Sequence, residues 1–160
     1  MNLRLRPAVP CDARLLVDID GEASAYPWSE AQITDACAAD VSPGKKTHSE
    51  CVLVVEHNEN TCGFIIYTLL LNEGSIHNIA VSPIYQRRGL ARVLLGEVLG
   101  IFTSAGASRA LLEVRASNTA AQCLYETFGF ELDGVRKNYY PSNGAREDAL
   151  LMSKRLITGE

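Results

Sequence analysis

The chain has 160 residues, of which 47% are hydrophobic and 21% are charged, a composition typical of a globular domain and not of a disordered or fibrous protein. Fifteen Lys and Arg against 19 Asp and Glu give a net charge of −4. This balance disfavours broad electrostatic binding to nucleic acid, so an anionic ligand needs a local basic site. Because the length suits a single core, we expect one domain over residues 1–160.

No apolar stretch of the kind found in secretory signals stands at the N-terminus, and the longest nearly apolar run is residues 63–71. That run is far shorter than the ~20 residues that span a bilayer, so we expect a cytoplasmic protein without membrane contact. Five scattered cysteines without a C-x-x-C pair favour reduced thiols. His48, His57 and His77 show no ligand spacing, so no metal is expected and these side chains are predicted to be structural or solvent-facing.

Hydrophobic periodicity and capping residues predict seven strands and four helices. In chain order these are a strand at residues 3–7, helices at 12–21 and 29–39, strands at 51–55, 63–71 and 75–81, a helix at 90–104, a strand at 110–115, a helix at 119–128, and strands at 130–135 and 149–154. The order β-α-α-β-β-β-α-β-α-β-β implies a mixed sheet in an α/β or α+β domain.

Local patterns refine three of these elements. Leu15, Leu16 and Ile19 are expected on one face of the first helix. Ser29 and Gln32 form a capping-box pattern that begins the second helix. Residues 40–50 are polar and contain Pro-Gly, which predicts a mobile surface loop.

Residues 86–92, Gln-Arg-Arg-Gly-Leu-Ala-Arg, lie between a predicted strand and a predicted helix. Glycine permits a tight turn whose backbone N–H groups point outward, and such a turn at a helix N-terminus binds phosphate. Arg87, Arg88 and Arg92 add positive charge, so a pyrophosphate would fit there. The segment matches neither the ATP-type nor the NAD-type glycine motif. A solvated basic turn is the alternative interpretation.

Two residues are candidates for acid–base chemistry. Glu113 interrupts an apolar strand, so it is either a general base among aliphatic side chains or the partner of a nearby arginine. Tyr125 follows Asn118 by seven residues, close to two helical turns, so both can address the same groove. A phenol can donate a proton to a leaving thiolate, and the alternative is a core tyrosine.

Together these residues resemble the GCN5-related N-acetyltransferase (GNAT) superfamily, and more closely its RimI type, the ribosomal-protein alanine N-acetyltransferases. The likeness spans about half the chain. The matching segments stand in family order at residues 78–81, 86–91, 112–118, 124–126, 136–141 and 146–149, and residues 27–29 extend the likeness toward the N-terminus.

The resemblance implies a mixed central sheet, flanked by helices, whose fourth and fifth strands splay apart around acetyl-CoA. It also implies that Glu113 is the base and Tyr125 the acid in a direct transfer, without a covalent enzyme intermediate and without a metal. The implied cofactor-binding residues are Ile79, Ala80 and Val81 on the strand, Arg87, Arg88, Gly89, Leu90, Ala91 and Arg92 in the loop, and Asn118 and Tyr125 beyond. Ala91 stands where the family more commonly has glycine.

For the acceptor, the resemblance implies the N-terminal alanine of a small-subunit ribosomal protein. An α-amino group suits direct attack because its pKa of about 7.7–8.0 leaves roughly 10–20% of it neutral at pH 7, far more than for lysine. Tyr139 and Tyr140, in a predicted loop between the last two strands, and Trp28 are candidates to line the peptide groove. Packing of the hairpin and anchoring of the second helix are the alternatives. We expect a monomer without direct nucleic-acid contact.

Two other functions fit the same residues. Loops determine acceptor choice, so other protein N-termini, a lysine or a small-molecule amine are alternative acceptors. A non-catalytic module that only binds acyl-CoA belongs to a different class, and the presence of Glu113 and Tyr125 disfavours it.

Overall fold

The computed structural model describes residues 2–39 and 47–157. Within these ranges the chain forms seven strands and four α-helices in the predicted order, together with two short 3-10 helices. The elements are β1 (Leu3–Pro7), η1 (Pro10–Asp12), α1 (Ala13–Ala23), α2 (Glu30–Ala38), β2 (Thr47–His57), β3 (Asn60–Leu70), β4 (Glu73–Val81), η2 (Pro83–Tyr85), α3 (Leu90–Ser104), β5 (Arg109–Arg115), α4 (Thr119–Thr127), β6 (Glu131–Ser142) and β7 (Ala145–Arg155).

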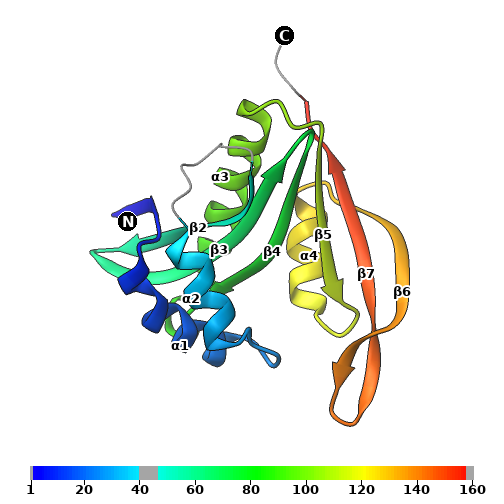
Figure 1. Ribbon diagram of the computed structural model, residues 1–160, viewed down its shortest axis with the longest axis horizontal. Coiled ribbons are helices and arrows are strands. Elements are labelled where there is room, and N and C mark those ends of the chain that lie inside the picture. Colours follow the sequence, from blue (N-terminus) through cyan, green and yellow to red (C-terminus); the bar gives the residue numbers. More distant parts are fainter. Residues whose placement is uncertain (1, 40–46, 158–160) are drawn as a thin grey trace.

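The strands form one mixed sheet in the order β1-β2-β3-β4-β5-β7-β6, as the element order predicts. Among the strands of the described residues, β4 and β5 alone pair in parallel, and the other neighbours are antiparallel. Helices cover both faces, with α1 and α2 on one side and α3 and α4 on the other (Figure 1). Each face buries its own apolar cluster, one beneath α1 and α2 and one beneath α3 and α4. Burial of both faces explains the nearly continuous apolar character of β3.

The two parallel strands diverge after a short paired stretch. Their register ends at Ile76 opposite Leu112, although β4 continues to Val81 and β5 to Arg115. Beyond that point β4 stays paired only with β3, and β5 only with β7, so the two strands separate (Figure 1). The splay implied by the family resemblance is therefore confirmed. Divergence leaves the facing edges of β4 and β5 free for a ligand.

A β-bulge in β4 coincides with this divergence. Ile76 and Asn78 pair with consecutive residues of β3, so His77 has no residue opposite it. A bulge of this kind redirects side chains locally. Ile76 lies in the cluster beneath α3, whereas Asn78 reaches Asp20 of α1 on the other face. The bulge therefore marks the position at which β4 turns polar side chains toward α1 and α2.

The predicted apolar face of α1 is partly wrong. Leu16 and Ile19 are buried, but Leu15 is 45% exposed, because adjacent helical residues point about 100° apart. Asp20 is buried instead and accepts hydrogen bonds from the Trp28 N–H (2.8 Å) and from Asn78 Nδ2 (3.2 Å). These two bonds satisfy a buried carboxyl group and hold the α1–α2 connection against β4.

The region around α2 confirms one prediction and corrects another. Ser29 Oγ accepts from the Gln32 N–H (3.1 Å), and Gln32 Oε1 accepts from the Ser29 N–H (2.9 Å), which is the predicted capping box. The predicted loop at residues 40–50 is wrong for its last four residues, because β2 already begins at Thr47, opposite Leu69. Pairing with β3 outweighs the polar composition there. Residues 40–46 lie outside the described part of the chain.

The loop predicted around Tyr139 and Tyr140 is also wrong, because β6 extends through both residues to Ser142. The hairpin instead turns at Asn143 and Gly144, whose positive φ angles of 37° and 80° suit the tight turns that join antiparallel strands. The edge position of β6 tolerates its proline. The β6–β7 hairpin consequently forms a long arm that extends past the end of β5 (Figure 1).

Two further expectations concern the rest of the described chain. None of the helices in residues 2–39 and 47–157 combines the length and the apolar character needed to cross a membrane. All five cysteines are free: Cys37, Cys51 and Cys62 are buried, and Cys11 and Cys123 are exposed.

Candidate active site

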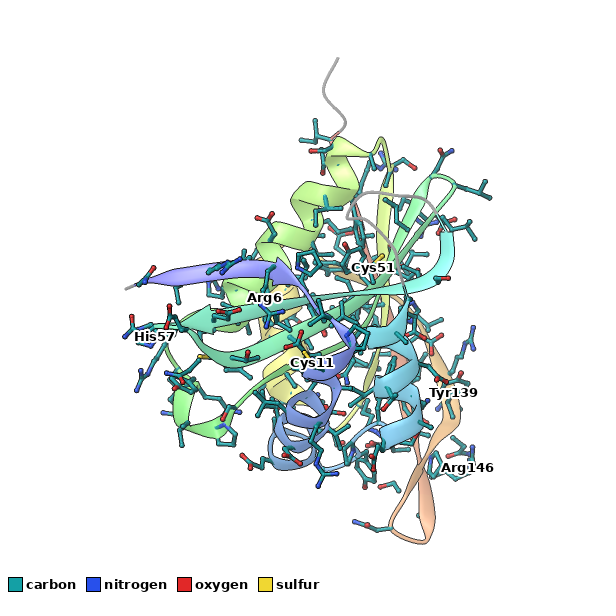
Figure 2. The ribbon with its side chains drawn as sticks, turned by 60° about the vertical axis from the view of Figure 1, so that its left-hand side comes forward. Arg6, Cys11, Cys51, His57, Tyr139 and Arg146 are labelled. Atoms are coloured by element: carbon teal, nitrogen blue, oxygen red, sulfur yellow. The ribbon has the colours of Figure 1, made fainter. Side chains whose placement is uncertain are left out.

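A cavity of about 860 Å³ lies on the α1–α2 face of the sheet, over the point where β4 and β5 diverge. Four predicted site residues line it: Trp28, Glu113, Tyr139 and Tyr140. His77, which the sequence suggested to be structural or solvent-facing, lines it as well. Tyr139 is labelled on the β6–β7 hairpin in Figure 2, next to Arg146, which donates to its carbonyl oxygen (2.8 Å). We refer to this space as the acceptor cavity.

Glu113 is exposed to the acceptor cavity, so the expected burial among aliphatic side chains is wrong. Side chains alternate along a strand, and the neighbours Leu112 and Val114 face the core in its place. Arg136 Nη1 lies 3.6 Å from Glu113 Oε1, and both side chains are partly exposed, at 52% and 33%. The arginine partner that the sequence left open is thus present as a long, solvated contact. A carboxylate placed in this way is accessible to an incoming amine.

Tyr125 lies on the opposite side of β5, on α4, and is 6% exposed. Its ring packs against Phe130 with a centroid distance of 5.7 Å. Burial raises the pKa of Tyr125 to about 12, and the neighbouring Tyr140 adds to this effect. The phenol therefore keeps its proton at neutral pH. Core packing and proton donation are compatible in this position, because only the hydroxyl group must be reached.

Asn118 has different surroundings from Tyr125. It is exposed at the N-cap of α4, where its Oδ1 accepts from the Ala121 N–H (3.2 Å). The structure does not show the Asn118 and Tyr125 side chains sharing one groove. Asn118 thus has a local structural role, and a contact with the cofactor would use the remaining lone pairs or the amide NH₂.

The turn before α3 has the geometry of an anion site. Gly89, at the N-cap of α3, has φ 79°, and Arg87 has φ 63°, so two residues of the turn adopt the left-handed conformation. Arg87 and Arg88 are exposed, and the Arg88 guanidinium lies 5.4 Å from the centre of the Tyr85 ring. Outward N–H groups and two solvated cations at a helix N-terminus suit a pyrophosphate.

The first turn of α3 is already partly engaged with the rest of the protein. Leu90 is buried, so only its backbone can face a ligand, and Ala91 is half-buried beside it. Arg92 Nη1 donates to Thr127 Oγ1 (3.1 Å), and its guanidinium lies 5.2 Å from the Phe128 ring centre. Of the three predicted arginines, Arg87 and Arg88 are therefore better placed than Arg92 for an added anion.

The unpaired edge of β4 completes this side of the site. The Ser82 N–H donates to the Cys62 carbonyl on β3 (2.7 Å). The backbone N–H and C=O groups of successive residues point to opposite edges of a strand. Those of Ala80 therefore point toward β3, and those of Ile79 and Val81 point into the space between β4 and β5. Gln86 Nε2 donates to the Val81 carbonyl (3.0 Å), which ties the phosphate turn to the strand end. An extended, amide-containing arm such as that of coenzyme A fits an edge of this kind.

An arginine stack adjoins the acceptor cavity through Tyr140, which lines the cavity, and sequence reasoning missed it. The Arg115 guanidinium lies 3.7 Å from the Tyr26 ring centre and 4.4 Å from that of Tyr140. Its Nη1 also donates to the Pro141 carbonyl (2.8 Å) and to Glu147 Oε1 (2.9 Å), and this bond lowers the pKa of Glu147. Arg115 thereby links the α1–α2 connection to the β6–β7 hairpin. The only signal in the sequence is that Arg115 lies within the matching segment 112–118.

Diverging parallel strands, an anion-binding turn at the start of α3 and a carboxylate-bearing cavity on the opposite face together define an acyl-CoA-dependent transferase. Residues 14–130 match the acetyltransferase (GNAT) family. The chain belongs to this family and is an acetyl-CoA-dependent N-acetyltransferase.

The similarity to curated acetyltransferases extends over most of the chain. The ribosomal protein bS18-alanine N-acetyltransferase of Escherichia coli strain K12 is 38% identical over 135 residues, which is 84% of this chain and 85% of that protein. The enzyme of the same name from Haemophilus influenzae is 36% identical over 146 residues, 89% and 92% of the two chains. The crystal structure of the ribosomal-protein-S18-alanine N-acetyltransferase from Escherichia coli matches with a TM-score of 0.85 at 33% identity, covering 99% of this chain and 97% of that one. The resemblance to the RimI type is therefore confirmed.

Proposed function

We propose that this enzyme transfers acetyl from acetyl-CoA to the α-amino group of the N-terminal alanine of a small-subunit ribosomal protein. The acceptor cavity carries the proposal. Trp28 from the α1–α2 side, Tyr139 and Tyr140 from the hairpin, and Glu113 from β5 all line it. The relatives named above, which act on the alanine of ribosomal protein bS18 by name, support this acceptor.

Acetyl-CoA supplies an activated carbonyl carbon, and the residues of the chain hold the two substrates and move protons. Arg87, Arg88 and the N–H groups of the turn hold the pyrophosphate, while the edge of β4 at Ile79 and Val81 binds the extended arm. The N–H of Val81 stabilises negative charge on the carbonyl oxygen. Glu113 accepts a proton from the acceptor amine, and Tyr125 delivers one to the leaving sulfur.

Mass spectrometry of the purified enzyme with acetyl-CoA tests the acceptor. We offer peptides that begin with alanine, the same peptides with a blocked N-terminus, lysine-containing peptides, free polyamines, and proteins extracted from small ribosomal subunits. We expect acetylation of unblocked alanine N-termini, located by fragmentation at the α-nitrogen. Turnover of a polyamine or a lysine side chain with no peptide N-terminus modified would overturn the proposal. Calorimetric binding of acetyl-CoA without turnover of any amine would instead support a binding module.

Arg115→Gln is expected to raise the KM for the acceptor peptide about tenfold while kcat and the KM for acetyl-CoA change less than twofold. The substitution removes the cation stacked on two rings, an interaction worth about 0.5–2 kcal/mol in general, and its bond to Glu147. The hairpin and the α1–α2 connection then keep only the hydrogen bond between the Tyr26 hydroxyl and Ser142 Oγ (2.8 Å) among the links described for these residues. Initial rates with each substrate varied in turn measure the effect.

Arg14→Gln serves as the matched control, because Arg14 is 77% exposed and only 3.9 Å from Glu30 on the surface. An exposed ion pair of this kind contributes little to stability, so we expect the Arg14→Gln enzyme to keep wild-type kinetics. An unchanged peptide KM in Arg115→Gln would show that the stack plays no part in acceptor binding.

A further inference from the structure

His77 and Glu113 occupy equivalent positions on the two diverging strands. Ile76 and Leu112 form the last parallel pair, and His77 and Glu113 follow them directly. Both side chains line the acceptor cavity. The bulge leaves His77 without a residue opposite it on β3, directly after the last parallel pair of β4 and β5.

The hydrogen bonding of His77 leaves one ring nitrogen available. Its Nε2 lies 2.9 Å from Thr68 Oγ1 on β3. Among the described residues Nδ1 has no hydrogen-bond partner. When the Nε2–H donates to the threonine hydroxyl, Nδ1 carries a lone pair that can accept a proton.

Burial favours a neutral His77 ring that can take up a proton, and the nearby Glu113 carboxylate partly opposes it. Desolvation of the ring lowers the pKa of His77, and the Glu113 carboxylate raises it by a smaller amount. The other titratable groups that line the cavity are Arg136, Tyr139 and Tyr140 on β6, with Arg109 and Asp133 also in the lining. Trp28 and Gln32 contribute no charge from the α1–α2 side. At neutral pH His77 therefore remains unprotonated and can act as a base, and the Glu113 carboxylate stabilises a proton that it takes up.

An amine that binds in its ammonium form, the major form of an α-amino group at pH 7, must lose two protons during acetylation. An ammonium group must lose one proton before its lone pair can attack, and the same nitrogen loses a second proton as the amide forms. The C–N bond forms and the C–S bond breaks, and the sulfur gains one proton. In total, two protons leave nitrogen, one ends on the thiol of coenzyme A, and one is released to solvent.

We propose that His77 is a second proton-accepting residue, which takes one of these two protons while Glu113 takes the other. The inference rests on the proposed acetyl transfer in this cavity. His77 accepts the ammonium proton at Nδ1 and releases it to the solvent that enters the cavity. Glu113 then remains a carboxylate for the proton lost during attack.

The pH dependence of kcat in His77→Gln tests this role. Glutamine keeps an amide near Thr68 and a similar volume, so we expect a 10- to 100-fold lower kcat and KM values within twofold of wild type. Wild-type kcat should fall as the pH drops through the range where His77 gains a proton, below the ordinary histidine value of about 6.5. His77→Gln should lack this fall. His57→Gln, which removes a histidine on β2 outside the cavity lining, is the control with wild-type kinetics.

A double variant separates proton transfer from positioning. In the Glu113→Gln background, His77→Gln should lower kcat at least fivefold further, because two independent acceptors are then missing. No additional loss, or a His77→Gln enzyme within twofold of wild type at every pH, would overturn the proposal. These kinetic measurements use whichever amine the wild-type enzyme acetylates. An error in the proposed acceptor therefore shows in the mass-spectrometry experiment and does not affect the test of His77.

A measurement on the unmodified side chain covers the case in which His77→Gln does not fold. NMR titration of the His77 ring in the wild-type enzyme should give a pKa below the ordinary histidine value. Glu113→Gln should lower it further, since the carboxylate favours the charged ring. A His77 signal that does not respond to Glu113→Gln would contradict the coupling on which the inference depends.

Discussion

Glu113→Gln is expected to lower kcat by about 100- to 1,000-fold, within the range of positioned general bases. Glutamine has nearly the same shape and keeps the strand and the cavity, but it cannot accept a proton from the amine. The exposed position of Glu113 in the cavity, beside a solvated Arg136, means that its charge contributes little to folding. The KM for acetyl-CoA should therefore stay within twofold. Steady-state kinetics across pH 6–9 with the acceptor peptide measure both effects.

Glu73→Gln provides the matched control for this variant. Glu73 lies on β4 at the paired end of the two strands, opposite Arg109 and away from the divergence. We expect its kcat and its pH profile to match wild type. A Glu113→Gln enzyme that loses less than threefold in kcat, or that keeps the wild-type pH profile, would remove Glu113 from the role of base.

Tyr125→Phe should lower kcat by about 30- to 100-fold with little change in acetyl-CoA affinity. The ring that packs on Phe130 is retained, so only the hydroxyl and its proton are lost. Because burial raises the pKa of Tyr125 to about 12, the donor form persists across the usual assay range. In the wild-type enzyme, deprotonation of Tyr125 should lower kcat only as the pH rises toward about 12. Tyr125 should not contribute to the pH dependence of kcat at acidic pH.

Tyr67→Phe is the matched control, since Tyr67 is another buried tyrosine whose pKa is raised by burial but which lies on β3 in the core. Loss of the Tyr67 hydroxyl in this variant should leave kcat unchanged. Calorimetry of acetyl-CoA binding to both variants separates chemistry from binding. If Tyr125→Phe turns over at the wild-type rate, Tyr125 is a core residue alone and the proton reaches sulfur by another path.

Predictions that rest on neighbouring residues agree well with the structure. The capping box of Ser29 and Gln32 consists of hydrogen bonds within three residues of the chain, so sequence spacing suffices to predict it. The glycine turn before α3 is equally local, because the left-handed conformation of Gly89 is intrinsic to glycine. The order of strands and helices follows from the same short-range periodicity.

Predictions about the three-dimensional environment of individual side chains agree less well with the structure. Glu113 belongs to the expected strand, but its side chain faces a cavity, because the core is reached only by alternate residues. Tyr139 and Tyr140 reach that cavity from a strand and not from a loop, since the turn forms at Asn143 and Gly144. Arg115 and Tyr26 form their stack from elements that are distant in sequence, and no periodicity reports on such a contact.

The sequence by itself determined the element order, the anion-binding turn and the family, because each depends on residues that are close together along the chain. Only the tertiary structure decided that His77 and Glu113 share one cavity while Tyr125 lies on the other face of β5. That arrangement depends on where β4 and β5 stop pairing and on the bulge at His77. Both are set by the packing of two helix layers on a twisted sheet, a balance of long-range contacts that no single segment encodes.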